Sequence, residues 1–154
     1  MFNITILAIG KIKEEHFSTA FTEYAKRLSP YIKFTVQELK AESFNEANKL
    51  RAKEQEGLRI LGYLEKYPDS KVFLLDEKGQ EHTSQEFSKV LEKSSSHFIF
   101  VIGGSLGFDF KILNRYTQHF SLSKLTLPHE LARVVLIEQI YRAVTIIKNK
   151  EYHY

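Results

Sequence analysis

Cysteine is absent from the 154-residue chain. Its absence excludes disulfide bonds, thiolate zinc sites and a cysteine nucleophile, and it fits a reducing cytoplasm. The histidines show no spacing typical of a metal site. We therefore expect a protein that binds no metal.

Long apolar runs are missing as well. None approaches the roughly 18 residues that a membrane span needs. Residues 1–7 have neither the basic region nor the small-residue cleavage site of a signal peptide. These observations predict a cytoplasmic protein without a membrane partner. The sequence also contains no internal repeat and no low-complexity segment.

The chain carries little net charge, +3 in all. Basic and acidic residues are interleaved, so this charge permits a polyanionic partner without requiring one. Hydrophobic residues make up 43% of the sequence and charged residues 27%, values typical of a soluble globular protein. Residues 1–154 fit a single domain that can bury roughly 68–70% of its unfolded surface.

The apolar pattern predicts strands that alternate with helices. Strands are expected at residues 3–9, 32–39, 72–75 and 98–102, with a short one within 119–127. Helices are expected at residues 14–28, 43–67, 83–93, 109–118 and 128–148. This order is typical of an α/β protein whose parallel or mostly parallel sheet has helices on both faces.

Capping and turn signals set several of these boundaries. The segments 43–46 and 83–86 are both capping-box patterns and predict two helix starts. Residues 76–82 are expected to form a loop, and residues 94–96 a short linker. Pro128 suits the first turn of the last helix, where its missing N–H is no loss. In helix 43–67 we expect a buried apolar stripe made of Leu50, Leu58, Leu61 and Leu64.

A glycine loop, residues 103–107, follows the most apolar predicted strand. Adjacent glycines let the backbone approach a ligand and offer N–H donors. The loop matches neither the dinucleotide fingerprint nor a P-loop, and a tight strand-to-helix turn explains it equally well. Ligands in such sheets bind beyond the carboxyl ends of the strands. That rule selects the loops after Leu75, after Ile102 and at 122–127.

The last predicted helix is apolar around most of its circumference, which is typical of a helix buried in a core or against another subunit. Glu138 and Arg142 lie four residues apart on it and can form an ion pair. A structural pair, at a dimer seam for example, explains them, and so does an arginine that binds a phosphate or a base edge. His153 follows in a tail between Tyr152 and Tyr154.

Four segments carry a resemblance to a known family: residues 5–13, 75–79, 100–108 and 122–143, together with the closing Tyr152-His153. The third reads Phe-Val-Ile-Gly-Gly-Ser-Leu-Gly-Phe and the fourth contains Leu-Thr-Leu-Pro-His-Glu-Leu-Ala-Arg-Val. The chain resembles the ribosomal RNA large subunit methyltransferase H family, a minimalist branch of the SPOUT methyltransferases. The resemblance covers the whole chain.

The resemblance implies a carboxyl-terminal trefoil knot, a topology that is otherwise essentially absent from proteins, and a homodimer. It also implies S-adenosylmethionine as cofactor. The implied cofactor-binding residues lie in the three loops already selected: Leu75, Gly103, Gly104, Leu122, Ser123, Lys124, Leu125, Thr126 and Leu127.

The implied substrate is a pseudouridine in a stem-loop of 23S rRNA, methylated at N3 in the assembled ribosome. By the same resemblance the catalytic group consists of His153, Arg142, Glu138 and Tyr152. His153 is the expected general base or base-orienting group. Arg142 would anchor the base or a phosphate, with its geometry fixed by Glu138.

Three other functions stay open at this point. Another RNA such as tRNA would use the same cofactor site. A non-enzymatic ribosome-binding factor would have no affinity for the cofactor. A nucleotide-binding protein of ordinary topology should carry an acidic residue about 20 positions beyond the glycine loop, whereas residues 122–127 contain neither Asp nor Glu.

Overall fold

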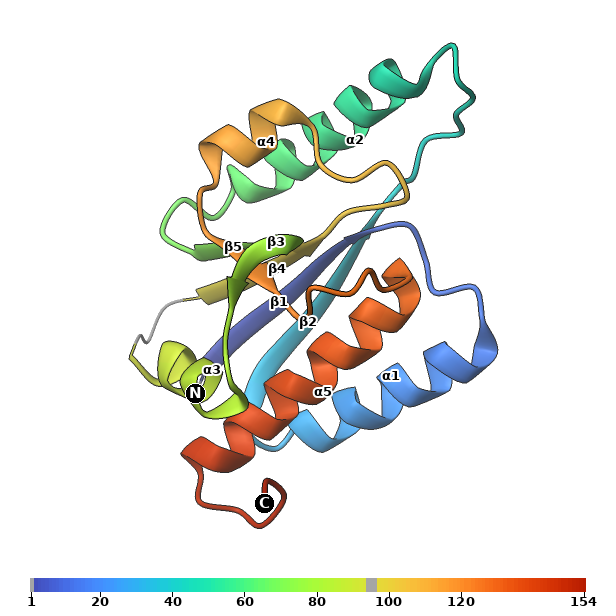
Figure 1. The fold of residues 1–154 in the computed structure, drawn as a ribbon. Coiled ribbons are helices and arrows are strands. Elements are labelled where there is room, and N and C mark those ends of the chain that lie inside the picture. The colour runs from blue at the N-terminus through green and yellow to red at the C-terminus, as the bar shows by residue number, and fades with distance from the viewer. Residues whose placement is uncertain (1, 94–96) are drawn as a thin grey trace.

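A computed structural model describes residues 2–93 and 97–154. Its centre is a single five-stranded sheet in which every pair of neighbouring strands is parallel, in the order β2-β1-β4-β3-β5 (Figure 1). The predicted α/β class and parallel sheet are confirmed, and the predicted linker at 94–96 lies outside the described residues. The strands are β1 (Phe2–Ile9), β2 (Ile32–Leu39), β3 (Lys71–Glu81), β4 (His97–Ile102) and β5 (His119–Ser121).

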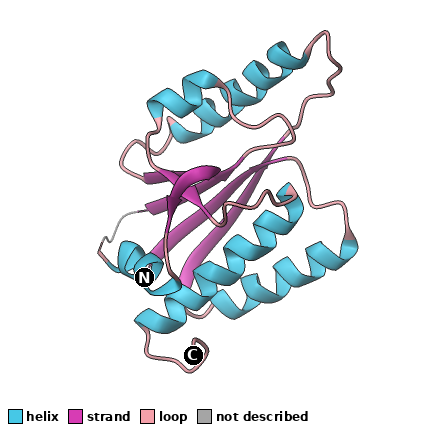
Figure 2. Cartoon of the chain, viewed as in Figure 1, coloured by secondary structure: helices cyan, strands magenta, loops and turns pink. Residues whose placement is uncertain are grey.

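Helices cover both faces of the sheet (Figures 1 and 2). One face packs against α1 (Glu15–Leu28), α3 (Ser84–Glu92) and α5 (His129–Ile147), and the other against α2 (Lys49–Leu64) and α4 (Phe110–Arg115). The central strands serve both cores because successive side chains point to opposite faces. In β4, Phe100 belongs to the first core and Val101 to the second.

One of the two predicted capping boxes is present. The Thr83 hydroxyl accepts the Glu86 N–H at 3.1 Å, and the Glu86 carboxylate accepts the Thr83 N–H at 2.7 Å. The predicted box at residues 43–46 was wrong, because α2 begins only at Lys49. The side chain of Asn45 accepts the N–H of Asn48 at 3.0 Å and forms a turn instead. Asn side chains compete with helix formation in this way.

The expected buried stripe of α2 was also partly wrong. Leu50 and Leu58 are 82% and 49% exposed. The buried face is made of Ala52, Glu56, Gly57, Ile60 and Leu64. Small residues on this face allow close packing: a Cβ at position 57 would lie 3.1 Å from the Asp109 Cβ.

The helix expected at residues 109–118 ends at Arg115. The chain beyond it already belongs to the sheet, because the Gln118 carbonyl accepts the Leu74 N–H at 2.9 Å. The loop expected at residues 76–82 was wrong as well. Strand β3 runs on to Glu81. It pairs with β5 through Leu74 and Leu75, and again through Gln80 and Glu81, with a register shift between the two stretches.

Gly79 lies where this irregular part of β3 meets β5. A Cβ added there would stand 2.6 Å from the backbone C and O atoms of His119, closer than real Cβ contacts. We expect Gly79→Ala to lower the free energy of unfolding by about 3 kcal/mol, and Tm by about 6–12 °C. Gly62→Ala is the control, because Gly62 lies in α2 with no atom near its Cβ position and should gain up to about 1 kcal/mol. Thermal unfolding of both variants checks this, and equal Tm values would contradict it.

Membrane-spanning helices and metal-binding clusters are both absent from the part of the chain that the structure describes. Within residues 2–93 and 97–154, no helix combines the length and apolar character needed to cross a membrane. In the same ranges, no cluster of three or more His, Asp or Glu side chains could hold a metal ion.

Candidate functional site

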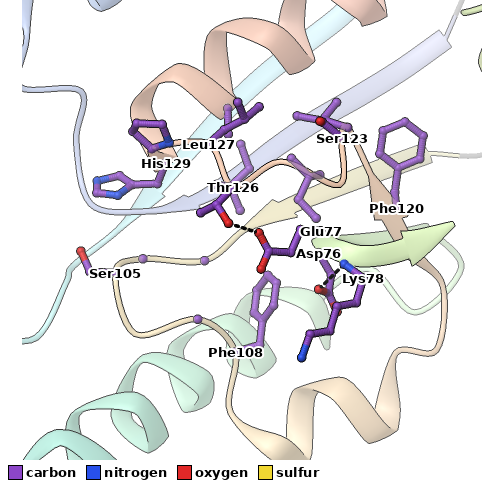
Figure 3. Close-up of a pocket in the computed structure, with 18 of the residues that line it drawn as sticks. Asp76, Glu77, Lys78, Ser105, Phe108, Phe120, Ser123, Thr126, Leu127 and His129 are labelled. Atoms are coloured by element: carbon purple, nitrogen blue, oxygen red, sulfur yellow. Dashed lines mark hydrogen bonds between the residues drawn. The ribbon is translucent and has the colours of Figure 1, made fainter. Parts of the chain in front are cut away.

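A cavity of about 740 Å³ lies beyond the carboxyl ends of β4 and β5 and beside the irregular part of β3. Three segments line it, together with the first turns of α5: the irregular part of β3 after Leu75, the loop after Ile102, and residues 122–127 (Figure 3). These are the three loops selected from the sequence by the strand-end rule. The lining includes Leu75, Gly103, Gly104, Leu122, Ser123, Leu125, Thr126 and Leu127.

Lys124 is the one expected cofactor-binding residue that does not line the cavity. Its ammonium group lies 3.5 Å from the Glu81 carboxylate, with 84% of the side chain exposed. Leu125 lines the cavity but is 75% exposed, so it stands at the mouth and not in the wall. The deeper apolar lining comes from Ile102, Phe108 and Phe120, which are buried.

The glycine loop brings its backbone against this apolar lining. A Cβ on Gly103 would lie 3.4 Å from the Phe108 ring, and one on Gly104 would lie 3.0 Å from the Ile9 side chain. Gly107 has a φ of +74°, a conformation that side-chain-bearing residues rarely adopt. The loop closes on itself through a bond from the Gly107 N–H to the Gly104 carbonyl at 3.0 Å. Its shape therefore depends on glycine at these positions.

Two carboxylates, Asp76 and Glu77, face the cavity and were not predicted as site residues (Figure 3). The Thr126 hydroxyl donates to the Glu77 carboxylate at 2.5 Å, and the Ser121 hydroxyl donates to the Glu77 backbone carbonyl at 3.1 Å. Glu77 thus ties the 122–127 loop to the irregular part of β3. Both acids directly follow Leu75, so the strand-end rule could have found them. They make the cavity suitable for a ligand that is partly cationic.

His129 also lines the cavity, at the first position of α5. From the sequence it could be interpreted as no more than a helix-start residue. The neighbouring Glu130 carboxylate accepts the backbone N–H groups of Lys13 and Glu14 at 2.8 and 3.1 Å. These bonds lower the pKa of Glu130 and fix the start of α5 against the segment before α1.

The four expected catalytic residues form a second cluster at the carboxyl end of α5. The Arg142 guanidinium donates to the Glu138 carboxylate at 3.0 and 2.5 Å, and the Tyr152 hydroxyl donates to the same carboxylate at 3.1 Å. Arg142 also stands over the Tyr152 ring, 4.8 Å from its centre. The Nη1 atom of Arg142 lies 3.2 Å from Nδ1 of His153. The predicted Glu138–Arg142 pair is therefore present, and it organises the tail.

The protonation of this cluster follows from its donors and acceptors. The bond to Glu138 raises the pKa of Arg142, and burial, with help from Tyr24 and Glu138, raises the pKa of Tyr152. Because arginine can only donate, the Nδ1 atom of His153 must accept, and neutral His153 carries its proton on Nε2. In this arrangement the Nε2–H is free to donate to a ligand.

One chain does not bring its two groups together. The cavity reaches Ala132 near the start of α5, whereas the tail cluster begins at Glu138 and centres on Arg142. Ten residues of helix separate Ala132 from Arg142, about 15 Å along the axis. Figure 1 shows the carboxyl terminus at the end of α5 remote from the carboxyl ends of the strands.

Comparison with known proteins gives the family. The family model of the predicted SPOUT methyltransferases matches residues 2–153. The chain belongs to the ribosomal RNA large subunit methyltransferase H family of SPOUT methyltransferases. Three relatives carry that family name. The relative from Clostridium perfringens is 42% identical to this chain, over 98% of this chain and 99% of the relative. The relative from Pelotomaculum thermopropionicum is 40% identical over 100% of both chains, and that from Bacillus thuringiensis is 43% identical over 98% of this chain and 99% of the relative.

Two solved structures share the SPOUT fold of this chain. One comes from Bacillus anthracis and one from Haemophilus influenzae Rd KW20, each with a TM-score of 0.59 and with 13% and 14% sequence identity. They cover 99% of this chain, which itself covers 100% of the first and 71% of the second. The resemblance seen in the sequence is confirmed, and the family match includes both the cavity and the tail cluster.

Proposed function

We propose that this SPOUT methyltransferase transfers a methyl group from S-adenosylmethionine to N3 of a pseudouridine in a 23S rRNA stem-loop. It acts on assembled ribosomes in the cytoplasm, as a homodimer whose carboxyl-terminal part forms a trefoil knot. The observation that carries the proposal is the full-length family match to relatives named as methyltransferases of large-subunit rRNA. A cavity and a polar tail cluster of suitable chemistry support it.

The residues around the cavity suit S-adenosylmethionine. Leu75, Leu122 and Leu127 offer apolar contact for a purine, and the backbone of the glycine loop offers N–H donors. Asp76 and Glu77 offer negative charge for a cationic ligand. When bound, the cofactor supplies an activated methyl group on a sulfonium.

The tail cluster would act on the base. N3 of pseudouridine is an imide N–H between two carbonyls, and its proton has to pass to solvent before N3 attacks the methyl group. His153, with Nδ1 held by Arg142, presents Nε2–H as a donor to a base carbonyl. This favours an orienting role for His153, which would stabilise the charge that develops on the deprotonated imide. Arg142 provides a fixed positive charge for the same purpose.

The separation of the two groups supports a site shared between two chains. Along the axis of α5, about 9 Å separates Ala132 at the cavity from Glu138, and about 15 Å separates it from Arg142. In a homodimer of twofold symmetry each surface meets its counterpart, so the tail of one protomer can reach the cavity of its partner. The apolar character of α5 outside the sheet contact agrees with burial against a second chain.

The small net charge favours a substrate presented by the ribosome. Neutralisation of phosphate charges dominates the affinity of proteins for free nucleic acid. A net charge of +3 provides little electrostatic attraction of this kind. A stem-loop that is already held in shape needs less electrostatic attraction, since RNA loops are recognised largely by shape and stacking.

Methyl-labelled S-adenosylmethionine tests the proposal. The purified protein is incubated with protein-free rRNA, free large subunits, and whole ribosomes from cells that lack this activity, with tRNA in a parallel reaction. We expect label on ribosomal substrate only, at one pseudouridine. Label on tRNA alone would move the substrate to another RNA. Absence of both label and cofactor binding would favour a non-enzymatic ribosome-binding factor.

A further inference from the structure

Glu56 is a buried acid at the sheet edge where the cavity lies. It sits on α2 with 4% of its surface exposed. Its Oε2 atom accepts the backbone N–H of Glu42 at 2.9 Å. Its Oε1 atom is buried and has no hydrogen-bond partner among the described residues. A buried carboxylate oxygen without a hydrogen-bond donor destabilises the fold, because it has lost its hydrogen bonds to water and has gained none from the protein.

The free oxygen faces the glycine loop. A Cβ on Gly104 would lie 3.5 Å from Oε1, so the loop backbone lies against the carboxylate. Gly104 lines the cavity and Glu56 does not. The loop that lines the cavity at Gly104 therefore also packs against the Glu56 carboxylate.

The surrounding charges compensate the Glu56 carboxylate only in part. Arg59, one helical turn further along α2, pairs with Glu42 and donates to the Lys40 carbonyl at 2.9 Å. Asp109, another acid, packs against Gly57, the next residue of α2. Burial raises the pKa of Glu56, opposed by the Glu42 N–H and by Arg59. Costly buried charges of this kind concentrate at functional sites.

We propose that Glu56 is a positioning residue that packs against the glycine loop and places a negative charge behind the cavity, favouring the cationic methyl donor over its neutral product. The inference rests on S-adenosylmethionine being the donor in the proposed function. Methyl transfer turns the sulfonium into a thioether, so the ligand loses one positive charge. A fixed negative charge nearby then strengthens binding of the donor and eases release of S-adenosylhomocysteine.

The test compares the affinities of S-adenosylmethionine and S-adenosylhomocysteine by calorimetry from pH 5 to 8. In Glu56→Gln we expect the ratio of the two affinities to fall by about fivefold, as for one charge acting at an intermediate dielectric. In the unsubstituted protein the preference should be present above the raised pKa of Glu56 and lost as the pH falls through it. In the variant this step should vanish. Glu54→Gln is the control, because Glu54 lies on the same helix with its carboxylate exposed and paired to Lys111 at 3.5 Å.

Each other outcome decides against the inference. An equal loss of both affinities in Glu56→Gln would show a role in folding alone. If the ratio of the two affinities in the unsubstituted protein did not change with pH, the inference would be overturned and the proposed function would stand. This pH series uses the unsubstituted protein alone, so it still decides the question if Glu56→Gln fails to fold. Failure of the unsubstituted protein to bind either ligand would overturn the proposed function as well.

Discussion

Mixing two inactive variants should restore methyl transfer. Arg142→Ala removes the guanidinium that holds Glu138 and His153, and leaves the cavity intact. Leu127→Arg places a charge in the cavity and leaves the tail intact. We expect each variant alone to lose at least about 100-fold in rate, the size found when a preorganised electrostatic contact is removed. An equal mixture, refolded together, should recover about a quarter of the original rate.

The recovery follows from the geometry of a shared site. If each site joins the cavity of one chain to the tail of its partner, a mixed dimer has one site with both defects and one with neither. About half of the dimers are mixed and half of their sites are intact, which gives about a quarter. A site made within one chain would carry one defect everywhere and show no recovery.

Two controls separate this result from misfolding. Arg142→Ala mixed with His153→Ala should stay inactive in either arrangement, because both defects lie in the tail. Cofactor affinity of Arg142→Ala, measured by calorimetry, should remain within about twofold of the original, because Arg142 does not line the cavity. An Arg142→Ala protein that transferred methyl groups at the original rate would contradict the role given to the tail cluster.

The sequence predicted those parts of the fold that depend on local pattern. Strand β4 could be found because it is covered on both faces and is apolar from Phe98 to Ile102. The start of α3 could be found because Thr83 and Glu86 form a capping box within four residues. The cavity followed from the order of elements, since parallel strands end at one edge of the sheet.

Contacts between distant residues could not be predicted in the same way. Residues 80–81 were predicted to lie in a loop, yet they pair with residues of β5 that are about 40 positions further along the chain. Leu50 fits an apolar stripe along the predicted helix, but α2 turns a different face toward the sheet, which includes Gly57 and Ile60, and leaves Leu50 exposed. The family resemblance gave both halves of the site. Their separation along α5 appeared only in the structure.

Arg133, a charged residue within the apolar helix α5, is buried, and its burial leads to the second large prediction. Its side chain is 1% exposed. It donates to the Glu38 carboxylate of β2 at 2.5 Å and to the Gly10 carbonyl beyond β1 at 3.1 Å. It thereby joins α5 to two strands at the edge of the sheet that forms the cavity. Ala132, its neighbour, lines that cavity.

We expect Arg133→Met to lower the free energy of unfolding by about 2–3 kcal/mol. Removing one partner of a fully buried pair costs about 3–5 kcal/mol, but the Glu38 side chain is 36% exposed and can regain water. For a chain of this length, Tm should fall by about 5–10 °C. Arg27→Met is the matched control, because its pair with Glu23 is exposed to solvent and should contribute little to stability.

A double-mutant cycle with Glu38→Gln isolates the pair itself. If the Arg133–Glu38 contact carries the effect, the double variant should be more stable than the sum of the single losses predicts, by about 1–2 kcal/mol. Cofactor affinity should fall in Arg133→Met and not in Arg27→Met, because only Arg133 fixes the start of α5 beside the cavity. A free energy of unfolding for Arg133→Met within about 0.5 kcal/mol of that of the unsubstituted protein would contradict the prediction. It would show that methionine packing replaces the ion pair, as hydrophobic residues do at some buried pairs.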